Sequence, residues 1–256
     1  MVDRLKYWIR SGSLDFARSF SNRQVKNELA TLNWRGHLIY YQPGTSDAEI
    51  LYKILLKPER KREYQPPTIK APKIIFDIGA NIGAATLWLN DLYPSAQIYS
   101  FEPAPRNFSI LQKNVKTHSN IKPINAALGA TDGTEQLFLS DNPNNLGGCS
   151  FFEAGSNTTE SISVTVYSPQ RILQELKIET VDLIKIVTEG AEHNILTSFP
   201  DSILKKTQWI FGELHGNKDF ELMAYLSEHF NISLNKDLNC RLCNFAAQNK
   251  YLGPLT

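Results

Sequence analysis

The stretch that decides the fold reads Phe76-Asp77-Ile78-Gly79-Ala80-Asn81-Ile82-Gly83. It continues the apolar run at residues 74–76, which is typical of a strand buried on both faces, and a helical pattern follows at 84–92. Glycine lets the backbone turn tightly and lets a ligand approach it, and a helix start offers unpaired N–H groups. We therefore predict a ligand-binding loop between the first core strand and its helix.

The same alternation of strand and helix continues along the chain. Strands are predicted at residues 98–101, 121–127, 181–186 and 209–212, and helices at 106–115, 170–176, 191–199 and 220–230. Residues 136–139 and 162–166 alternate apolar and polar residues like an antiparallel pair, with an Asn- and Gly-rich loop at 141–148 between them. This order predicts an α/β fold, a mostly parallel sheet covered by helices on both faces.

The first part of the chain differs from the rest in its pattern of residues. Residues 1–70 are predicted to form an N-terminal helical arm and linker, and residues 71–256 the main domain. Within the arm we expect one or two amphipathic helices at 5–32 and a strand at 37–41. A further helix is expected to start at Ser46 or Asp47, and a linker rich in Lys, Arg and Pro follows at 57–72.

Composition excludes several classes of protein. The 256 residues have an average share of hydrophobic residues, 42%, and a net charge of +1, so neither wholesale disorder nor a strongly basic nucleic-acid binder is expected. The three cysteines predict no disulfide framework and no metal site. No apolar run reaches the ~18 residues of a membrane span. We expect a cytoplasmic enzyme whose partner is a small molecule. The sequence leaves open whether the protein forms a homo-oligomer.

A second feature indicates the nucleotide. Glu102 directly follows the second strand, where a carboxylate can accept hydrogen bonds from both hydroxyls of a ribose. A nicotinamide enzyme should show G-x-G-x-x-G, whereas Gly79 and Gly83 are spaced G-x-x-x-G. The carboxylate of Asp77 would repel a pyrophosphate but could bind an amino group. The pattern therefore favours S-adenosylmethionine, with a nicotinamide-dependent oxidoreductase as an alternative.

Several segments together resemble one family. They are Asp77–Gly83, Phe101-Glu102-Pro103, Asn125-Ala126-Ala127-Leu128-Gly129, Glu189-Gly190-Ala191-Glu192 and Gly212-Glu213-Leu214-His215-Gly216. The chain resembles the FkbM-type S-adenosylmethionine-dependent methyltransferases. The resemblance implies a Rossmann-like, seven-stranded class I fold, and methyl transfer to a hydroxyl of a sugar, a glycan or a small secondary metabolite.

The resemblance also implies roles for individual residues. Asp77, Gly79 and Asn81 would line the methionine part of the cofactor on the loop that ends at Gly83, and Glu102 would hold the ribose. The backbone near Asn125, Ala126 and Ala127 would meet the adenine. The arm would fold over the cofactor through Ser46 and Asp47, although Asp47 is equally well explained as a helix N-cap.

One position departs from the family pattern, which reads Lys-Ile-Asp-x-Glu-Gly where this chain has Lys185-Ile186-Val187-Thr188-Glu189-Gly190. The missing carboxylate at Val187 is expected near the cofactor and the acceptor. We hypothesise that Val187 lowers activity more than it disturbs folding. A catalytically silent cofactor-binding module is therefore an alternative.

Deprotonation of an acceptor hydroxyl would need a base. His215 follows the fifth strand, and the ordinary pKa of histidine suits that role. Glu189 and Glu213 also follow sheet strands and could orient His215 or bind acceptor hydroxyls. We therefore predict His215, Glu189 and Glu213 as the catalytic residues, while an ordinary packed histidine is as good an explanation of His215.

Overall fold

The main sheet has seven strands. In the computed structural model, which describes residues 2–20, 25–65, 69, 71–138, 160–216, 218–235 and 243–252, the strand order is β11-β12-β10-β9-β3-β4-β5. The bounds are β11 (Phe230–Asn235), β12 (Cys243–Asn249), β10 (Trp209–Leu214), β9 (Leu183–Ile186), β3 (Ile74–Ile78), β4 (Gln97–Phe101) and β5 (Ile121–Ile124). β12 runs in the direction opposite to that of the other six strands of this sheet. The predicted mostly parallel α/β sheet is confirmed.

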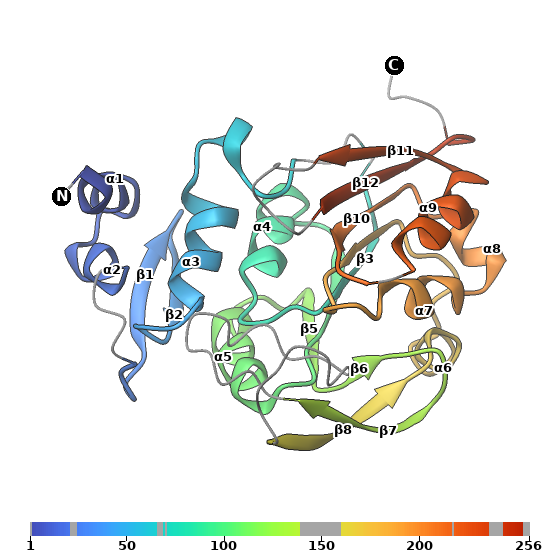
Figure 1. Cartoon of the computed structure of the whole chain (residues 1–256), viewed down its shortest axis with the longest axis horizontal. Helices are drawn as coiled ribbons and strands as arrows, with labels where there is room; N and C mark the ends of the chain where they lie inside the picture. The colour runs from blue at the N-terminus through green and yellow to red at the C-terminus, as the bar shows by residue number, and fades with distance from the viewer. Residues whose placement is uncertain are drawn as a thin grey trace.

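Helices cover both faces of this sheet (Figure 1). One face packs on α4 (Ala84–Leu92) and α5 (Pro105–Val115), and the other on α6 (Pro169–Glu175), α7 (Glu192–Thr197), α8 (Asp201–Leu204) and α9 (Asp219–Ser227). Strand side chains alternate between the two cores: Ile75 points to the first, Phe76 and Ile78 to the second. The chain turns from one side of β3 to the other, so ligands are expected at the carboxyl ends of the central strands.

The N-terminal segment contains a hairpin as well as helices. It comprises α1 (Val2–Ser11), α2 (Leu14–Ser19), β1 (Ala30–Trp34), β2 (His37–Tyr41), α3 (Asp47–Leu51), the π-helical turn η1 (Tyr52–Leu56) and the 3₁₀ turn η2 (Glu59–Lys61). The expectation of helix up to residue 32 is wrong at its end, because β1 pairs with β2. Arg35 and Gly36, with φ of 49° and 86°, form the two-residue turn that closes the hairpin. The boundary at residue 70 stays a prediction.

Two further differences concern short strands. The strand expected at 121–127 ends at Ile124, and residues 127–128 form β6 (Ala127–Leu128) in a separate three-stranded sheet of order β6-β8-β7. There β7 (Gly133–Phe138) and β8 (Ser161–Tyr167) form the predicted antiparallel pair. The helix expected to reach residue 230 ends at Ser227, and β11 begins at Phe230. The loop predicted at 141–148 lies outside the described residues. Among those described, no helix is long and apolar enough to cross a membrane.

Candidate active site

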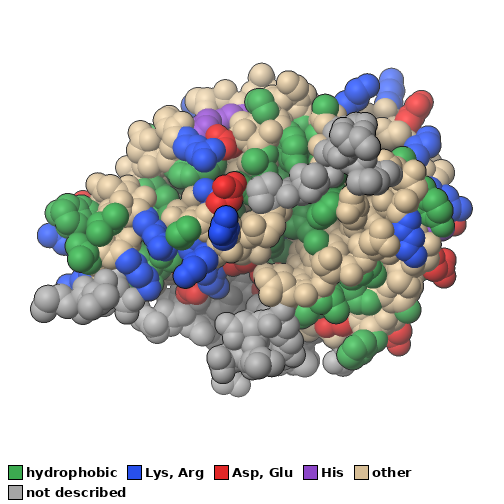
Figure 2. Space-filling model, turned by 90° about the horizontal axis from the view of Figure 1, so that it is seen from above, with side chains coloured by type: hydrophobic (Ala, Val, Ile, Leu, Met, Phe, Trp, Pro, Cys, Tyr) green, Lys and Arg blue, Asp and Glu red, His purple; other side chains and the backbone are tan. Residues whose placement is uncertain are grey.

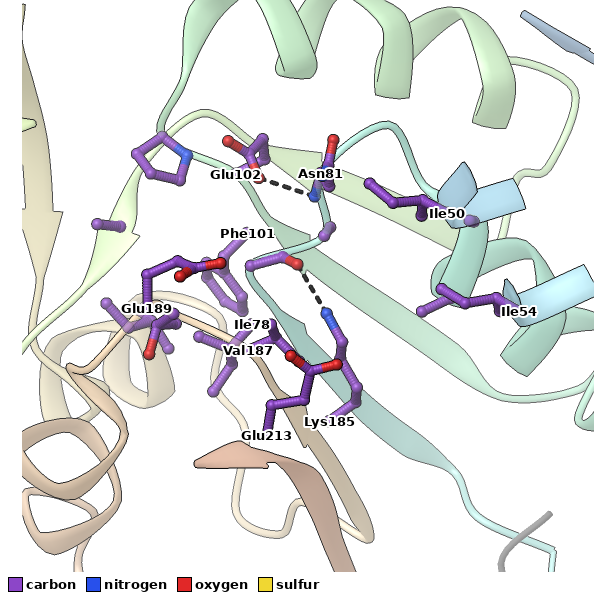
Figure 3. A pocket seen from close by; sticks show the side chains of 18 of the residues that line it. Ile50, Ile54, Ile78, Asn81, Phe101, Glu102, Lys185, Val187, Glu189 and Glu213 are labelled. Atoms are coloured by element: carbon purple, nitrogen blue, oxygen red, sulfur yellow. Dashed lines mark hydrogen bonds between the residues drawn. The ribbon is translucent and has the colours of Figure 1, made fainter. Parts of the chain in front are cut away.

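A cavity of about 210 Å³ lies at the carboxyl ends of the central strands (Figure 3). Its lining comes from the loop after β3, from the ends of β4, β9 and β10, and from the N-terminal segment. Glu102 and Asn81 lie on one side of this space, whereas Val187, Glu189 and Glu213 lie on another. The cavity therefore has one end at Glu102 and another at Glu189 and Glu213.

The loop after β3 needs its glycines for packing. Gly79 has a φ of 76°, and a Cβ there would lie 1.9 Å from the carbonyl oxygen of Val187, the residue that follows β9. Gly83, with a φ of 92°, starts α4, and a Cβ there would lie 2.7 Å from Leu111 Cδ1. Gly79 lines the cavity, whereas Gly83 does not. Both glycines thus permit close packing within the protein, and only Gly79 also faces the cavity.

Asp77 lies beneath the cavity and does not line it. Its side chain is fully buried, Lys185 Nζ lies 3.0 Å from Oδ1, and Thr86 Oγ1 donates a 2.6 Å hydrogen bond to Oδ2. Lys185, which lines the cavity, also donates a 2.7 Å hydrogen bond to the carbonyl oxygen of Gly79. The carboxylate of Asp77, which was expected to meet an amino group of a ligand, is therefore paired with Lys185 of the protein itself. This pair holds the loop after β3 in place.

Glu102 and Asn81 form one end of the cavity. The Glu102 carboxylate accepts hydrogen bonds from the backbone N–H groups of Asn81 at 2.7 Å and Ala104 at 2.9 Å. Burial raises the pKa of Glu102 to about 7, against the opposing effect of these hydrogen bonds. Asn81 adopts a positive φ of 51°, and its buried Oδ1 atom has no hydrogen-bond partner among the residues that the structure describes. A ligand that donates hydrogen bonds would complete this end of the cavity.

The segment expected to meet the adenine reaches the cavity only at its end, Ala127. The Asn125 side chain donates hydrogen bonds to the carbonyl oxygens of Glu102 and Pro103, at 2.8 and 3.1 Å, and so joins the ends of two strands. Neither Asn125 nor the buried Ala126 lines the cavity, whereas Ala127 and Leu128 do. Asn125 therefore supports this wall of the cavity without lining it.

Asp47, and not Ser46, attaches the N-terminal segment to the main domain. Neither lines the cavity, and the side chain of Ser46 makes no cap hydrogen bond. The buried Asp47 receives two hydrogen bonds from the guanidinium of Arg106 on α5, at 2.9 and 2.6 Å, and one from the backbone N–H of Gln42. Asp47 is thus neither a helix N-cap nor a group facing the cavity, but the anchor of the segment that covers it.

The predicted catalytic residues form a buried charged cluster. The Nδ1 atom of His215 lies 3.1 Å from Glu192 Oε1, and its Nε2 atom lies 3.2 Å from Glu213 Oε2 and 3.9 Å from Glu189 Oε2. Burial favours the neutral imidazole, but these carboxylates outweigh it and raise the pKa of His215 to about 10.

A histidine with such a pKa is protonated near neutral pH and cannot act as a base there. The pKa assumed for His215 is therefore wrong, and His215 does not line the cavity. Glu189, with a φ of 53°, and Glu213 do line it, and Val187 lies between them and the loop after β3. The cationic imidazole accounts for the presence of several carboxylates in one place.

Sequence reasoning missed the residues that the N-terminal segment contributes. Ile50, Lys53, Ile54, Glu63 and Tyr64 all line the cavity. Burial and the nearby Glu213 raise the pKa of Glu63 to about 7, and the interaction with His215 lowers the pKa of Glu213 against the effect of burial. Glu63 lies within the stretch expected to be a linker, where no local pattern distinguishes it from its charged neighbours.

Comparisons with known proteins agree with this geometry. The model of the methyltransferase FkbM domain matches residues 77–237. "Methyltransferase 1" of Beauveria bassiana is 31% identical over 50% of this chain and 58% of its own length. "31-O-demethyl-FK506 methyltransferase FkbM" of Streptomyces tacrolimicus is 22% identical over 56% of this chain and 65% of its own length.

A solved structure has the same fold. The crystal structure of a methyltransferase FkbM from Methylobacillus flagellatus superposes with a TM-score of 0.53 at 16% identity, over 75% of this chain and 48% of that one. The chain thus spans between about half and two thirds of the length of these three relatives. The family model covers more than half of the chain and starts within β3. This protein belongs to the FkbM methyltransferase family and has the class I methyltransferase fold.

Proposed function

We propose that this protein transfers a methyl group from S-adenosylmethionine to a hydroxyl of a sugar, a glycan or a small secondary metabolite. The observation that carries the proposal is the two-ended cavity, in which Glu102 and Asn81 lie opposite Glu189 and Glu213. The Streptomyces relative, whose name describes methylation at an oxygen of FK506, supports an oxygen acceptor.

Glu102 and Asn81 suit this cofactor. Glu102 would bind the hydroxyls of a ribose, because its carboxylate has lone pairs left after accepting two backbone hydrogen bonds. The unpartnered Oδ1 of Asn81 would accept a further hydrogen bond, for example from an ammonium group. When bound, S-adenosylmethionine supplies a methyl group that is already activated, so the protein's task is alignment and removal of the acceptor proton.

Glu63 suits that removal better than His215. A base is most effective when its pKa lies near the working pH, and the pKa of Glu63 is about 7. Glu213 stays ionised because it faces the protonated His215, so its negative charge raises the proton affinity of Glu63. Glu63 would accept the proton of the hydroxyl at a carboxylate oxygen, and His215 acts as a positioning residue behind Glu213.

Ligand binding tests the choice of cofactor. Thermal melting with S-adenosylhomocysteine and, separately, with NAD should show stabilisation by the first only. Stabilisation by NAD alone would overturn the proposed cofactor in favour of the oxidoreductase alternative.

Activity tests the reaction. Transfer of a labelled methyl group to neutral polyols such as methyl glucoside should be measured for the protein as it stands and for Val187→Asp and Glu63→Gln. Val187→Asp should raise the rate, and Glu63→Gln should lower kcat by about 100-fold or more while leaving S-adenosylhomocysteine affinity unchanged. Tight S-adenosylhomocysteine binding without transfer by any of these variants would favour a silent binding module. Equal rates with Val and Asp at position 187 would refute the hypothesis that Val187 lowers activity.

A further inference from the structure

Helix α1 has apolar residues on two opposite sides. Its inner side presents Tyr7, whose ring stacks on Phe20 with centroids 3.8 Å apart and meets the Tyr52 ring edge-on at 4.6 Å. Its outer side presents Leu5, Trp8 and Ile9, spaced i, i+3 and i+4, which places them in one stripe. These three side chains are 52%, 43% and 69% exposed. Burial against the protein core therefore explains only one of the two apolar sides.

Cations lie along both edges of this outer stripe. At about 100° per residue, Arg4 and Lys6 project on either side of Leu5 and so flank the stripe. Leu14, at the start of α2, is 54% exposed and adds to the apolar surface at this end of the molecule. Figure 2 shows hydrophobic side chains gathered at this end with Lys and Arg side chains around them.

The charge and the size of this surface indicate its partner. Residues 2–20 carry four cationic side chains and two carboxylates. Four half-exposed apolar side chains offer roughly 400 Å², given the ~150–250 Å² that a large side chain buries. A stable protein dimer needs about 800 Å² from each partner and is depleted in Lys at its centre. An apolar stripe with Arg and Lys at its edges is instead the pattern of a helix lying in a lipid interface.

We propose that α1 docks this protein on a membrane surface that contains anionic lipids. Leu5, Trp8 and Ile9 enter the boundary between headgroups and acyl chains. Arg4 and Lys6, whose Nζ atom lies 4.8 Å from the centre of the Tyr7 ring, add positive charge beside this stripe that attracts anionic headgroups. The helix lies along the surface and does not span the bilayer. This inference does not depend on the proposed methyl transfer, because it concerns a surface at the far end of the molecule from β10 (Figure 1).

Flotation with phosphatidylcholine vesicles, prepared with and without phosphatidylserine, tests the proposal on the full chain. The unmodified protein should float with vesicles that contain phosphatidylserine and much less with phosphatidylcholine alone. Ile9→Glu should weaken binding about tenfold or more, since a buried aliphatic side chain is lost. Lys6→Glu should weaken only the binding that depends on phosphatidylserine, by about fivefold or more.

A matched control distinguishes vesicle binding through this stripe from nonspecific binding through any exposed apolar side chain. Phe220 on α9 is 89% exposed and stands between Asp219 and Glu221, so Phe220→Glu should leave vesicle binding unchanged. Thermal melting and S-adenosylhomocysteine binding should confirm that each variant is folded. The proposal is overturned if the unmodified protein does not float, or if Ile9→Glu floats equally well. Ultracentrifugation that shows a dimer, lost in Ile9→Glu and without vesicle binding, would also overturn it in favour of a second copy as the partner.

Discussion

Replacing Lys185 by methionine should destabilise the fold strongly. Lys185 and Asp77 are only 4% and 0% exposed, and their charged atoms lie 3.0 Å apart. The substitution removes this ion pair and the 2.7 Å hydrogen bond to the Gly79 carbonyl, and leaves Asp77 with Thr86 as its hydrogen-bond donor. Removing one partner of a buried pair costs about 3–5 kcal/mol. That is a large share of the ~5–15 kcal/mol by which folded proteins are stable.

A double-mutant cycle isolates the pair from other effects. Asp77→Asn combined with Lys185→Met removes both charges, so the double variant should be more stable than the sum of the two single losses implies, by at least about 2 kcal/mol. Urea unfolding followed by tryptophan fluorescence measures all three variants.

An exposed pair on α8 supplies the comparison. Lys205 lies 3.8 Å from Asp201, and both side chains are more than half exposed. Lys205→Met should change stability by less than about 0.5 kcal/mol. If Lys185→Met loses no more than this control, or if the losses in the cycle simply add, Asp77 does not depend on Lys185. The idea that Asp77 serves the loop rather than the ligand would then fail.

Three further outcomes follow from the site. Gly79→Ala should lose more than about 2 kcal/mol in urea unfolding, because a positive φ and the carbonyl of Val187 both oppose a Cβ; a smaller loss would mean that the loop can shift. Arg106→Ala should lose about 2 kcal/mol and expose the N-terminal segment to limited proteolysis, because Asp47 is left buried without its cation; unchanged proteolysis would contradict that role. Glu102→Gln should weaken S-adenosylhomocysteine binding at least about tenfold in calorimetry. Since the pKa of Glu102 is raised from 4.5 to about 7, native stability should fall as pH rises through this window, and the Gln variant should lack that part of the slope.

The central sheet was predictable because its signals are local. The apolar run of β3, the glycines after it and the apolar pattern of α4 are consecutive in the chain, so both elements lie where the sequence predicts them. The hairpin of β1 and β2 was half missed, because the aromatic spacing before residue 32 also fits a helix. A turn of Arg35 and Gly36 between two short apolar runs is the signal that could have revealed it.

The roles of charged residues were harder to predict, because they depend on pairing between strands. Asp77 and Lys185 are far apart in sequence, yet they are direct partners in the parallel register of β3 and β9. Only that register shows that the charge of Asp77 is balanced by a lysine of the protein itself. Likewise, the pKa of His215 depends on Glu192 and Glu213, which reach it from a helix and a strand. A residue's position after a strand therefore predicts that it lies near the site, and says little about its charge.

Part of the cavity lining lies outside the stretch that matches the family model. Glu102 and Asn81 lie within the stretch that matches the family model, whereas Lys53 and Glu63 lie before it. A wall that serves a common cofactor can be shared across a family, but a wall that meets the acceptor must differ as acceptors differ. Acceptor choice in this protein should therefore depend on the N-terminal segment. Because the pair of Asp47 and Arg106 holds that segment in place, weakening the pair should impair the acceptor end of the cavity more than the cofactor end.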